Sequence, residues 1–594
     1  MVWYNTYLIM TYYDLRWRRT GADMRKNRIT VGLFTGALIL VALWIGVQEW
    51  RQLRWEEPLF SLIVESAGEE ERICCWQSGE GDYYMFLPGP DALRHARFQP
   101  KSGVTISLDG AALSQDEMLD DIVWNFPYSM EAVEDNRKIY ASVTFLCSEN
   151  VPSLFLDTAS GSMDHIHREK GNEEPGTMRL YQADGILDYQ GDLKRINGRG
   201  NATWLMSEKK PYSLELMSPG NLLGMGEATE WILLANAFDA SNLRNKIVLD
   251  YTACVSSVFT PESRWVNLYL NGAYAGLYLL CERIEVGETR VNIPEQGSFL
   301  VSSDLDWRLI EGGRRFFTTE YGFSMRIHHA GMDEQELENL LNTAERAIRA
   351  PDGVDPVSGK SWQTLLDGDS WARKLLLEEI FGNLDGGFVS QYFYLDGADP
   401  EGKIVAGPVW DYDITMGNPV NGAISGPNQL FALRTAFYYF DEAAWFHYLY
   451  QQEEFAQLVR QLYAREFRPL LDDLFGQKVD GYTEYISTAA QLNEIRWKHE
   501  LAETYSESVE VLRDYMSRRI AFLDSFWINQ DPYFMVEAMG FESAMCFAVK
   551  PGQTLPGLYV EVSDPQWYRV GTDTLFDVTQ PIYEDVQIYL GDYS

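Results

Sequence analysis

The chain has 594 residues and a mass of 68.1 kDa, too long for one hydrophobic core, so we expect about two to four domains. Hydrophobic residues make up 46% and charged residues 23%, which excludes a wholly disordered chain or one long coiled coil. The 87 Asp and Glu residues outnumber the 49 Lys and Arg residues, and the net charge of −38 excludes a general nucleic-acid binder, which needs a basic face.

Cysteine is scarce, with six residues and no C-x-x-C pair. The sequence therefore predicts neither a zinc knuckle nor a scaffold built on disulfides, although one or two bridges stay open.

The N-terminal segment has the pattern of a membrane anchor. Residues 29–47 are uncharged and apolar, and at 1.5 Å per residue a helix of this length spans about 28 Å, close to one hydrocarbon core. Residues 1–28 carry a net charge of +4, which places them in the cytoplasm by the positive-inside rule. The alternative is a cleavable signal peptide, but Gln48-Glu49-Trp50 offers no small-residue cleavage site. We expect a single-pass protein of the cell membrane whose remaining domains are extracytoplasmic.

The next segments differ in their secondary-structure pattern. Residues 58–150 show short aromatic and β-branched runs between turn formers, which predicts a β-sandwich-like module or two smaller β-modules. From 151 to 530 strands are followed by helices. The first helical block contains amphipathic patterns at 333–349 and 369–381, and a second helical block runs from about 441. Asn271-Gly272 between two alternating runs predicts a hairpin. Residues 531–594 return to strands and predict a small C-terminal β-cap.

Three segments carry polar residues that packing alone does not require. The first joins Gly198-Arg199-Gly200-Asn201 to Lys209-Lys210-Pro211-Tyr212. In an extended strand Lys210 lies on the same face as the apolar residues that follow, and a Lys that points inward needs an anion. Arg199 between two glycines can bring a guanidinium and backbone N–H groups to one ligand. The alternative is a turn with two solvated lysines.

The second segment contains Asp385, which follows an amphipathic helix and precedes Gly386-Gly387 and an apolar strand. An acid at this place is either a turn former or a catalytic carboxylate.

The third segment places Asp411 and Asp413 in alternation with bulky apolar residues, so that both face one side of a strand. Two like charges on one face repel each other, and a divalent cation is the usual resolution. The alternative is a pair of solvated acids on an edge strand.

Together these segments resemble the spore coat protein H (CotH) kinase family over residues 150–420, with the helical block to about 530 as the usual tail. The resemblance rests on motifs that follow one another in the family's order: R-G-N-A-T-W at 199–204, K-K-P-Y-S-L-E-L at 209–216, W-I-L-L-A-N-A-F-D-A-S-N-L-R-N at 231–245, V-N-L-Y-L-N-G-A-Y-A-G-L-Y-L-L-C-E-R-I at 266–284, G-N-L-D-G-G-F-V-S-Q-Y-F-Y-L at 382–395 and W-D-Y-D-I-T-M-G at 410–417.

The resemblance implies an α+β fold with an atypical protein-kinase-like core, a helical C-lobe, and ATP with Mg²⁺ or Mn²⁺ as cofactors. It implies transfer of the ATP γ-phosphate to Ser or Thr of envelope or spore-coat proteins. By its motifs Asp385 is the base, or orients the acceptor hydroxyl, and Asp411 and Asp413 hold the metal.

Further roles follow from the same resemblance. Lys210, or else Lys209, contacts the phosphates and pairs with Glu282, with help from Arg199. Family members often carry an Asn a few residues after the catalytic acid, and here Gln391 offers the corresponding amide as a metal ligand.

Two further functions stay open at this stage. One is a non-catalytic structural or binding protein of the cell envelope or spore surface with a degenerate kinase-like core. The other is an unrelated transferase that acts on an envelope polymer. For a kinase, the acidic surface predicts a Ser-rich, basic protein substrate and no nucleic-acid partner. The apolar residues 29–47 predict contact with the membrane.

Overall fold

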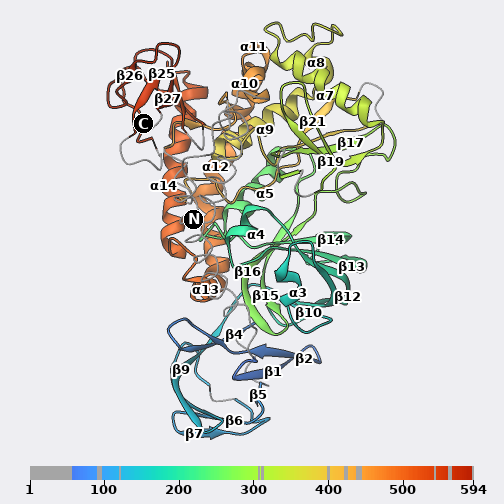
Figure 1. Cartoon of the computed structure of the whole chain (residues 1–594), viewed down its shortest axis with the longest axis vertical. Coiled ribbons are helices and arrows are strands. Elements are labelled where there is room, and N and C mark those ends of the chain that lie inside the picture. The colour runs from blue at the N-terminus through green and yellow to red at the C-terminus, as the bar shows by residue number, and fades with distance from the viewer. Residues whose placement is uncertain are drawn as a thin grey trace, which may run out of the picture.

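The computed structural model describes residues 57–89, 96–119, 122–305, 308–309, 313–397, 402–419, 426–435, 444–540, 544–558 and 565–591. Figure 1 shows an elongated molecule with an N-terminal β-module at one end, a barrel in the middle, and helices with two further sheets at the other end. The prediction of a mixed α+β fold is confirmed.

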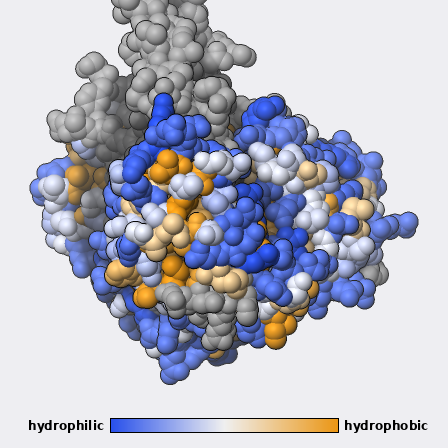
Figure 2. Space-filling view, turned by 90° about the horizontal axis from the view of Figure 1, so that it is seen from below, coloured by the Kyte–Doolittle hydropathy of each residue, from blue (hydrophilic) through white to orange (hydrophobic). Residues whose placement is uncertain are grey.

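The N-terminal module consists of two sheets. The smaller has the order β2-β1-β5 (Glu69–Cys74, Phe60–Ser66, Arg97–Pro100). The larger has the order β3-β4-β9-β8-β6-β7 (Trp76–Gln77, Tyr83–Leu87, Arg137–Cys147, Pro127–Glu134, Val104–Leu108, Ala111–Leu113). Apolar residues of both sheets share one core. Figure 2 shows that apolar side chains also reach the outer face at this end, and exposed ones in this module include Met118, Val123 and Phe126.

Seven strands then form a closed barrel in the order β10-β11-β12-β13-β14-β16-β15. Their bounds are Ser153–Thr158, Glu173–Tyr181, Leu187–Gly198, Tyr212–Asn221, Glu227–Leu234, Ala273–Glu282 and Ser263–Leu270. A parallel pairing of β10 with β15 closes the barrel, and residues such as Leu154, Trp231 and Leu268 fill it. The predicted hairpin at Asn271-Gly272 is confirmed, because it joins β15 to β16 and both residues have positive φ, as a two-residue turn requires.

Short helices lie on and beside the barrel: α3 (Asp164–Arg168), α4 (Ala202–Met206) and α5 (Arg244–Val255). Beyond α5 comes a five-stranded sheet in the order β18-β19-β17-β20-β21 (Phe316–Thr318, Ser324–Ala330, Phe299–Ser303, Tyr392–Leu395, Ile404–Ala406). The helices α7 (Glu334–Arg349), α8 (Trp362–Leu365) and α9 (Gly368–Phe381) join β19 to β20 along the chain. Both patterns therefore form helices, as predicted, but only α7 is amphipathic, because α9 is buried on nearly all sides.

The C-terminal third is helical and ends in a sheet. Its helical elements are α10 (Trp445–Tyr450), α11 (Glu453–Leu462), η2 (Tyr463–Phe467), α12 (Arg468–Asp473), η3 (Leu474–Lys478), α13 (Val479–Trp497), α14 (Tyr505–Leu523) and η4 (Asp524–Ile528). The last sheet has the order β22-β24-β23-β27-β25-β26 (Gln429–Leu430, Ala544–Val549, Phe534–Met539, Val586–Leu590, Trp567–Arg569, Leu575–Phe576). Figure 1 shows α13 and α14 beside both the barrel and the upper helices, so they connect the two halves.

Helix α9 is buried nearly all round and carries charged side chains into the core. Trp371, Leu375 and Ile380 are fully buried, as are Glu378 and Glu379. Buried charges are tolerated only with partners. The Glu379 carboxylate accepts N–H bonds from residues 431, 432 and 433 and pairs with the fully buried Arg519 of α14 at 2.9 Å. Arg519 also donates to the carbonyls of residues 379, 427 and 429.

Two sequence-based expectations change. The membrane span predicted at residues 29–47 lies outside the described residues. Among the described helices none is long and apolar enough to cross a bilayer, since the longest, α13 and α14, have 19 residues each and carry charged residues along their length. The predicted single-pass location in the cell membrane is therefore contradicted. All six cysteines are free, so the disulfides that the sequence left open do not form.

We expect Arg519→Met to destabilise the fold by about 3–5 kcal/mol, because it leaves the buried Glu379 carboxylate without its counter-ion. Calorimetric melting and urea unfolding measure the change. The matched control is Arg518→Met, since Arg518 and its partner Asp514 are 56% and 66% exposed and such pairs contribute little. Equal melting temperatures for the two variants would show that Glu379 needs no counter-ion.

Candidate active site

The loop that carries Asp385 is held by the last turn of α9. Helix α9 ends at Gly382, whose φ of +64° allows the chain to turn and whose added Cβ would meet the Tyr515 hydroxyl at 2.6 Å. Asn383 then bonds back to Glu378 twice: its N–H donates to the carbonyl at 2.9 Å and its Nδ2 to Oε2 at 2.6 Å. The Asp385 N–H donates to Asn383 Oδ1 at 3.1 Å. The position of Asp385 is therefore set from within the core.

The loop that carries Asp411 is tied to the same carboxylate. The Tyr412 hydroxyl donates to Glu378 Oε1 at 2.7 Å, and the Tyr412 N–H donates to Asn245 Oδ1 on α5 at 2.8 Å. Asp411 precedes this anchor with φ +71°, a left-handed conformation that Asp adopts more readily than most residues. Residues 408–418 form no strand, so the prediction that Asp411 and Asp413 share a strand face is wrong. The two side chains are instead presented by a turn.

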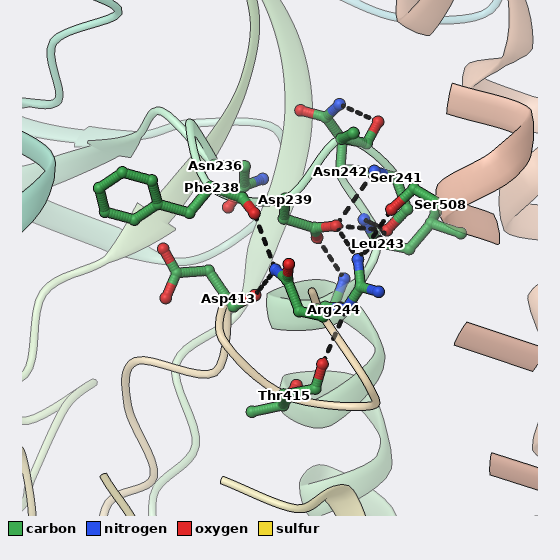
Figure 3. A network of polar contacts seen from close by, with 12 residues as sticks. Asn236, Phe238, Asp239, Ser241, Asn242, Leu243, Arg244, Asp413, Thr415 and Ser508 are labelled. Carbon is green, nitrogen blue, oxygen red and sulfur yellow. Dashed lines mark hydrogen bonds and ion pairs between the residues drawn. The ribbon is translucent and has the colours of Figure 1, made fainter. Parts of the chain in front are cut away.

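A third set of contacts fixes the far end of this turn. Figure 3 shows Arg244, the first residue of α5, among Asp239, Ser241 and Ser508. Its Nε donates to the Thr415 carbonyl at 2.9 Å, which fastens the segment after Asp413. In Figure 3 the Asp413 carboxylate points away from this network. Arg244 and Asp239 therefore position the turn, while the Asp413 carboxylate stays available for a ligand.

The three carboxylates act on one another. Burial and the charge of Asp411 together raise the pKa of Asp385 to about 6, although Arg308 and Arg434 oppose the shift. Burial also raises the pKa of Asp413 well above its usual value, and Asp411, Asp239 and Asp385 add to this effect. Like charges in a poorly solvated space disfavour ionisation. The arrangement therefore favours a cation or a transferable proton at this place.

Cationic side chains stand opposite these acids. The Arg199 guanidinium lies over the Trp410 ring, 5.3 Å from its centroid, and the charge of Asp411 opposes the lowering of its pKa that burial causes. The charge of Arg199 acts on Lys170. The charge of Asp304 acts on Lys170, on Arg326 and on Asp385. Arg199 thus lies over the residue before Asp411, and a guanidinium beside a carboxylate suits an anionic ligand with a divalent cation.

The family model of the CotH kinase protein matches residues 196–523, which is more than half of the chain and includes both loops. The chain belongs to the CotH kinase protein family. No curated protein matches it.

Within this CotH chain, both lysines of the first motif donate to backbone carbonyls, Lys209 to one in the barrel and Lys210 to one in α4. The ammonium of Lys209 is buried, donates to the Leu277 carbonyl at 2.6 Å and lies over the Tyr278 ring, and burial lowers its pKa to about 7. The Lys210 ammonium donates to the Trp204 carbonyl at 2.6 Å. We expected Lys210 to point inward, on the assumption that it lies in a strand. Strand β13 begins only at Tyr212, and the buried Lys is Lys209.

Glu282 does not form the expected pair with Lys210 in the contacts that the structure shows. Its buried carboxylate bonds to Arg290 and accepts the Glu262 N–H at 2.8 Å. Burial raises the pKa of Glu282 to about 7. This acid therefore stabilises the rim of the barrel.

Ser390, and not Gln391 as we expected, contacts Asp411. The Gln391 side chain is buried and its Nε2 donates to the Val389 carbonyl at 2.8 Å, with Oε1 left without a partner. The Ser390 hydroxyl donates to Asp411 Oδ2 at 3.2 Å instead. Ser390 follows Asp385 by five positions, the spacing at which protein kinases place their metal-binding Asn. That spacing is the signal in the sequence that identifies Ser390.

The donor set fits a hard divalent cation. Asp411 and Asp413 supply carboxylate oxygens, and Ser390 supplies a neutral oxygen beside Asp411. Mg²⁺ and Mn²⁺ prefer such ligands, and Mg²⁺ usually takes only one or two carboxylates and fills its shell with water and phosphate. These are the residues that would hold the metal. Among the described residues, Glu208, His499 and Glu500 form a group of three whose ligand atoms lie within 4.8 Å of one another, and this group lies elsewhere.

We expect Mn²⁺ with ADP to raise the melting temperature of the protein, and Asp413→Asn to remove the shift, because the variant loses a charged ligand. Glu208→Gln is the control, since it removes a carboxylate from the other group. If the rise in melting temperature persists in Asp413→Asn and disappears in Glu208→Gln, the metal binds to the group that contains Glu208.

Proposed function

We propose that this chain is a metal-dependent protein kinase that transfers the γ-phosphoryl group of ATP to a Ser or Thr hydroxyl. The family supports kinase activity in general. The observation that carries the proposal is that both acidic loops, those of Asp385 and Asp411, are fastened to the carboxylate of Glu378. One buried group thus sets the separation between a base and a metal ligand, the two groups that phosphoryl transfer requires.

In this proposal Asp385 accepts the proton of the acceptor hydroxyl. The hydroxyl oxygen forms a bond to the γ-phosphorus while the bond from that phosphorus to the β–γ bridging oxygen breaks, and ADP leaves with the electron pair. A pKa of about 6 lets Asp385 be ionised at neutral pH and still take up a proton. Phe388 and Val389 donate their N–H groups to the Asp385 carbonyl at 3.0 Å, which fixes the backbone of the turn that carries Asp385.

The remaining groups balance charge. Arg199 offers a guanidinium to phosphate oxygens, and its stacking on Trp410 keeps it beside Asp411. A divalent cation held by Asp411 and Asp413 would neutralise charge on the phosphates. Lys209 stays a candidate for phosphate contact only if its bond to the Leu277 carbonyl opens.

The second candidate is a non-catalytic structural or binding protein. In protein kinases a Lys pairs with an acid of this kind, but here Arg290 pairs with the Glu282 carboxylate, which favours the second candidate. It is also favoured by Ser390 in place of Asn. The two variants below separate the candidates.

We expect Asp385→Asn to lower kcat by about 10²–10⁴-fold, because the amide cannot accept the proton. The measurement is transfer of radiolabelled phosphate from ATP to a Ser-containing peptide, with ADP–Mn²⁺ binding as the test of an intact site. Asp369→Asn is the control, since Asp369 makes only an exposed pair with Arg373 near the start of α9. Undiminished transfer by Asp385→Asn would refute the role of Asp385, and absence of transfer by the unaltered protein would favour the second candidate.

We expect kcat/KM to fall about tenfold per pH unit below an apparent pKa of about 6 and to level off above it. The sign follows from the raised pKa: the carboxyl keeps its proton until the pH rises past this value, so the base form is lost on the acid side. Asp304→Asn should move the fall to lower pH, because it removes a negative charge that raises the pKa of Asp385. A profile that is flat to pH 5 would contradict this assignment.

A further inference from the structure

The segment of residues 426–435 lies between the last sheet and the turn that carries Asp385. It belongs to the sheet through β22, which pairs with β24. It also lies against the turn, because a Cβ added at Gly387 would meet the Cα of Ala432 at 3.3 Å. The segment therefore connects the C-terminal sheet with the loop after α9.

Arg434, in this segment, joins the sheet and the turn directly. Its side chain is buried, and its Nη1 donates to the carbonyl of Ala544, the first residue of β24, at 3.3 Å. Its Nη2 donates to the carbonyl of Leu384, the residue before Asp385. The guanidinium also lies over the Phe388 ring, 5.1 Å from its centroid. A planar guanidinium with donors on separate nitrogens can hold two carbonyls at once, which suits Arg better than Lys.

These contacts reach the turn on both sides of Asp385. Leu384 precedes Asp385, and the Phe388 N–H closes the turn by donating to the Asp385 carbonyl at 3.0 Å. A buried carbonyl that loses its donor costs free energy, so movement of the turn is opposed by its bond to Arg434. The turn is thus fixed by Glu378 of α9 on one side and by the C-terminal sheet, through Arg434, on the other.

We infer that Arg434 is a positioning residue for Asp385 and that, through it, the C-terminal sheet is a structural part of the active site. Strands β23–β27 cover residues 534–590, beyond residue 523, where the match to the family model ends. The inference rests on the proposed function for the role of Asp385 as base. The connection between sheet and turn can nevertheless be measured without turnover.

The charge of Arg434 acts in the same sense as its bonds. It opposes the rise in the pKa of Asp385 that burial and the charge of Asp411 cause; Arg308 also opposes this rise, and Asp304 adds to it. Arg434 therefore helps Asp385 to stay ionised at neutral pH, as a base must be.

The experiment measures backbone hydrogen exchange by mass spectrometry on the full chain, in peptides that cover residues 384–389. The variant Arg434→Lys keeps the charge, but its single ammonium cannot reproduce the two separate donors that hold both carbonyls. We expect exchange in these peptides to be about tenfold faster than in the unaltered protein, because the N–H groups of Phe388 and Val389 are protected by the turn.

Asn428→Ala is the matched control. The Asn428 Nδ2 donates to the Ala548 carbonyl of β24 at 2.9 Å, so this variant weakens the attachment of the same segment to the sheet without removing a bond to the turn. Its exchange over residues 384–389 should be unchanged. If Arg434→Lys fails to fold, Phe388→Leu takes its place, because it removes the ring below the guanidinium and leaves both carbonyl bonds.

Kinetics test the position of the base itself. We expect Arg434→Lys to lower kcat about tenfold and to leave KM for ATP and the affinity for ADP–Mn²⁺ unchanged, because Arg199 and Asp411 keep their places. Arg434→Met also removes the charge, so the fall of kcat/KM on the acid side should move to higher pH.

The outcomes are distinct. Faster exchange over residues 384–389 in Arg434→Lys but not in Asn428→Ala supports the inference, even if no phosphate is transferred and the proposed function fails. Unchanged exchange there overturns the inference, even if kinase activity is found. Equal acceleration in both variants also overturns it, because Arg434 would then stabilise only the sheet. In an active protein, an unchanged kcat of Arg434→Lys overturns it as well.

Discussion

Two adjacent carboxylates at the end of a buried helix organise the candidate active site. Glu378 and Glu379 follow one another on the last turn of α9, and their side chains point to different loops. Glu378 pairs with Lys374 at 2.7 Å and accepts from Asn383 and Tyr412. Glu379 accepts three consecutive N–H groups and pairs with Arg519. Because a buried carboxylate must keep every partner, a shift of one loop would leave a charge unsatisfied in the core. The loops are thus coupled to the packing of α9 and are held in a fixed relation before any ligand binds.

The sequence predicts much of this fold where the signal is local. The period of 333–349 predicts α7, and Asn271-Gly272 predicts the β15–β16 hairpin, because each depends on neighbouring residues. Closure of the barrel depends on the parallel pairing of β10 with β15, more than a hundred residues apart, and no local pattern records it. The roles of Glu378 and Glu379 are equally hidden. Their sequence reads as two acids on a helix, and only the tertiary structure shows that both are buried.

The lysines show how a strand prediction can assign the wrong face. Counting from Leu216 back to Lys210 assumes an unbroken strand, whereas β13 begins at Tyr212 and the preceding Pro211 alters the alternation. As a result Lys209 is the buried residue, and its ammonium bonds to Leu277 across the barrel wall. Ser390 has no amide, so the family pattern points to Gln391 in its place. The chain turns at Ser390, whose φ is +57°, and the Ser390 hydroxyl donates to Asp411.

The net charge of the chain and the charges around the candidate site determine different properties of this molecule. The excess of acids governs long-range steering and solubility, which depend on the summed field over the surface. Recognition at the site depends on the groups around it, such as the Arg199 guanidinium, which lies 5.3 Å from the ring centroid of Trp410, the residue before Asp411. Burial lowers the pKa of Lys170 and Arg326, and the charges of neighbouring cations add to this effect. The net charge of −38 therefore does not decide what binds beside Asp385 and Asp411, because that depends on the charges around the site and not on their sum over the surface.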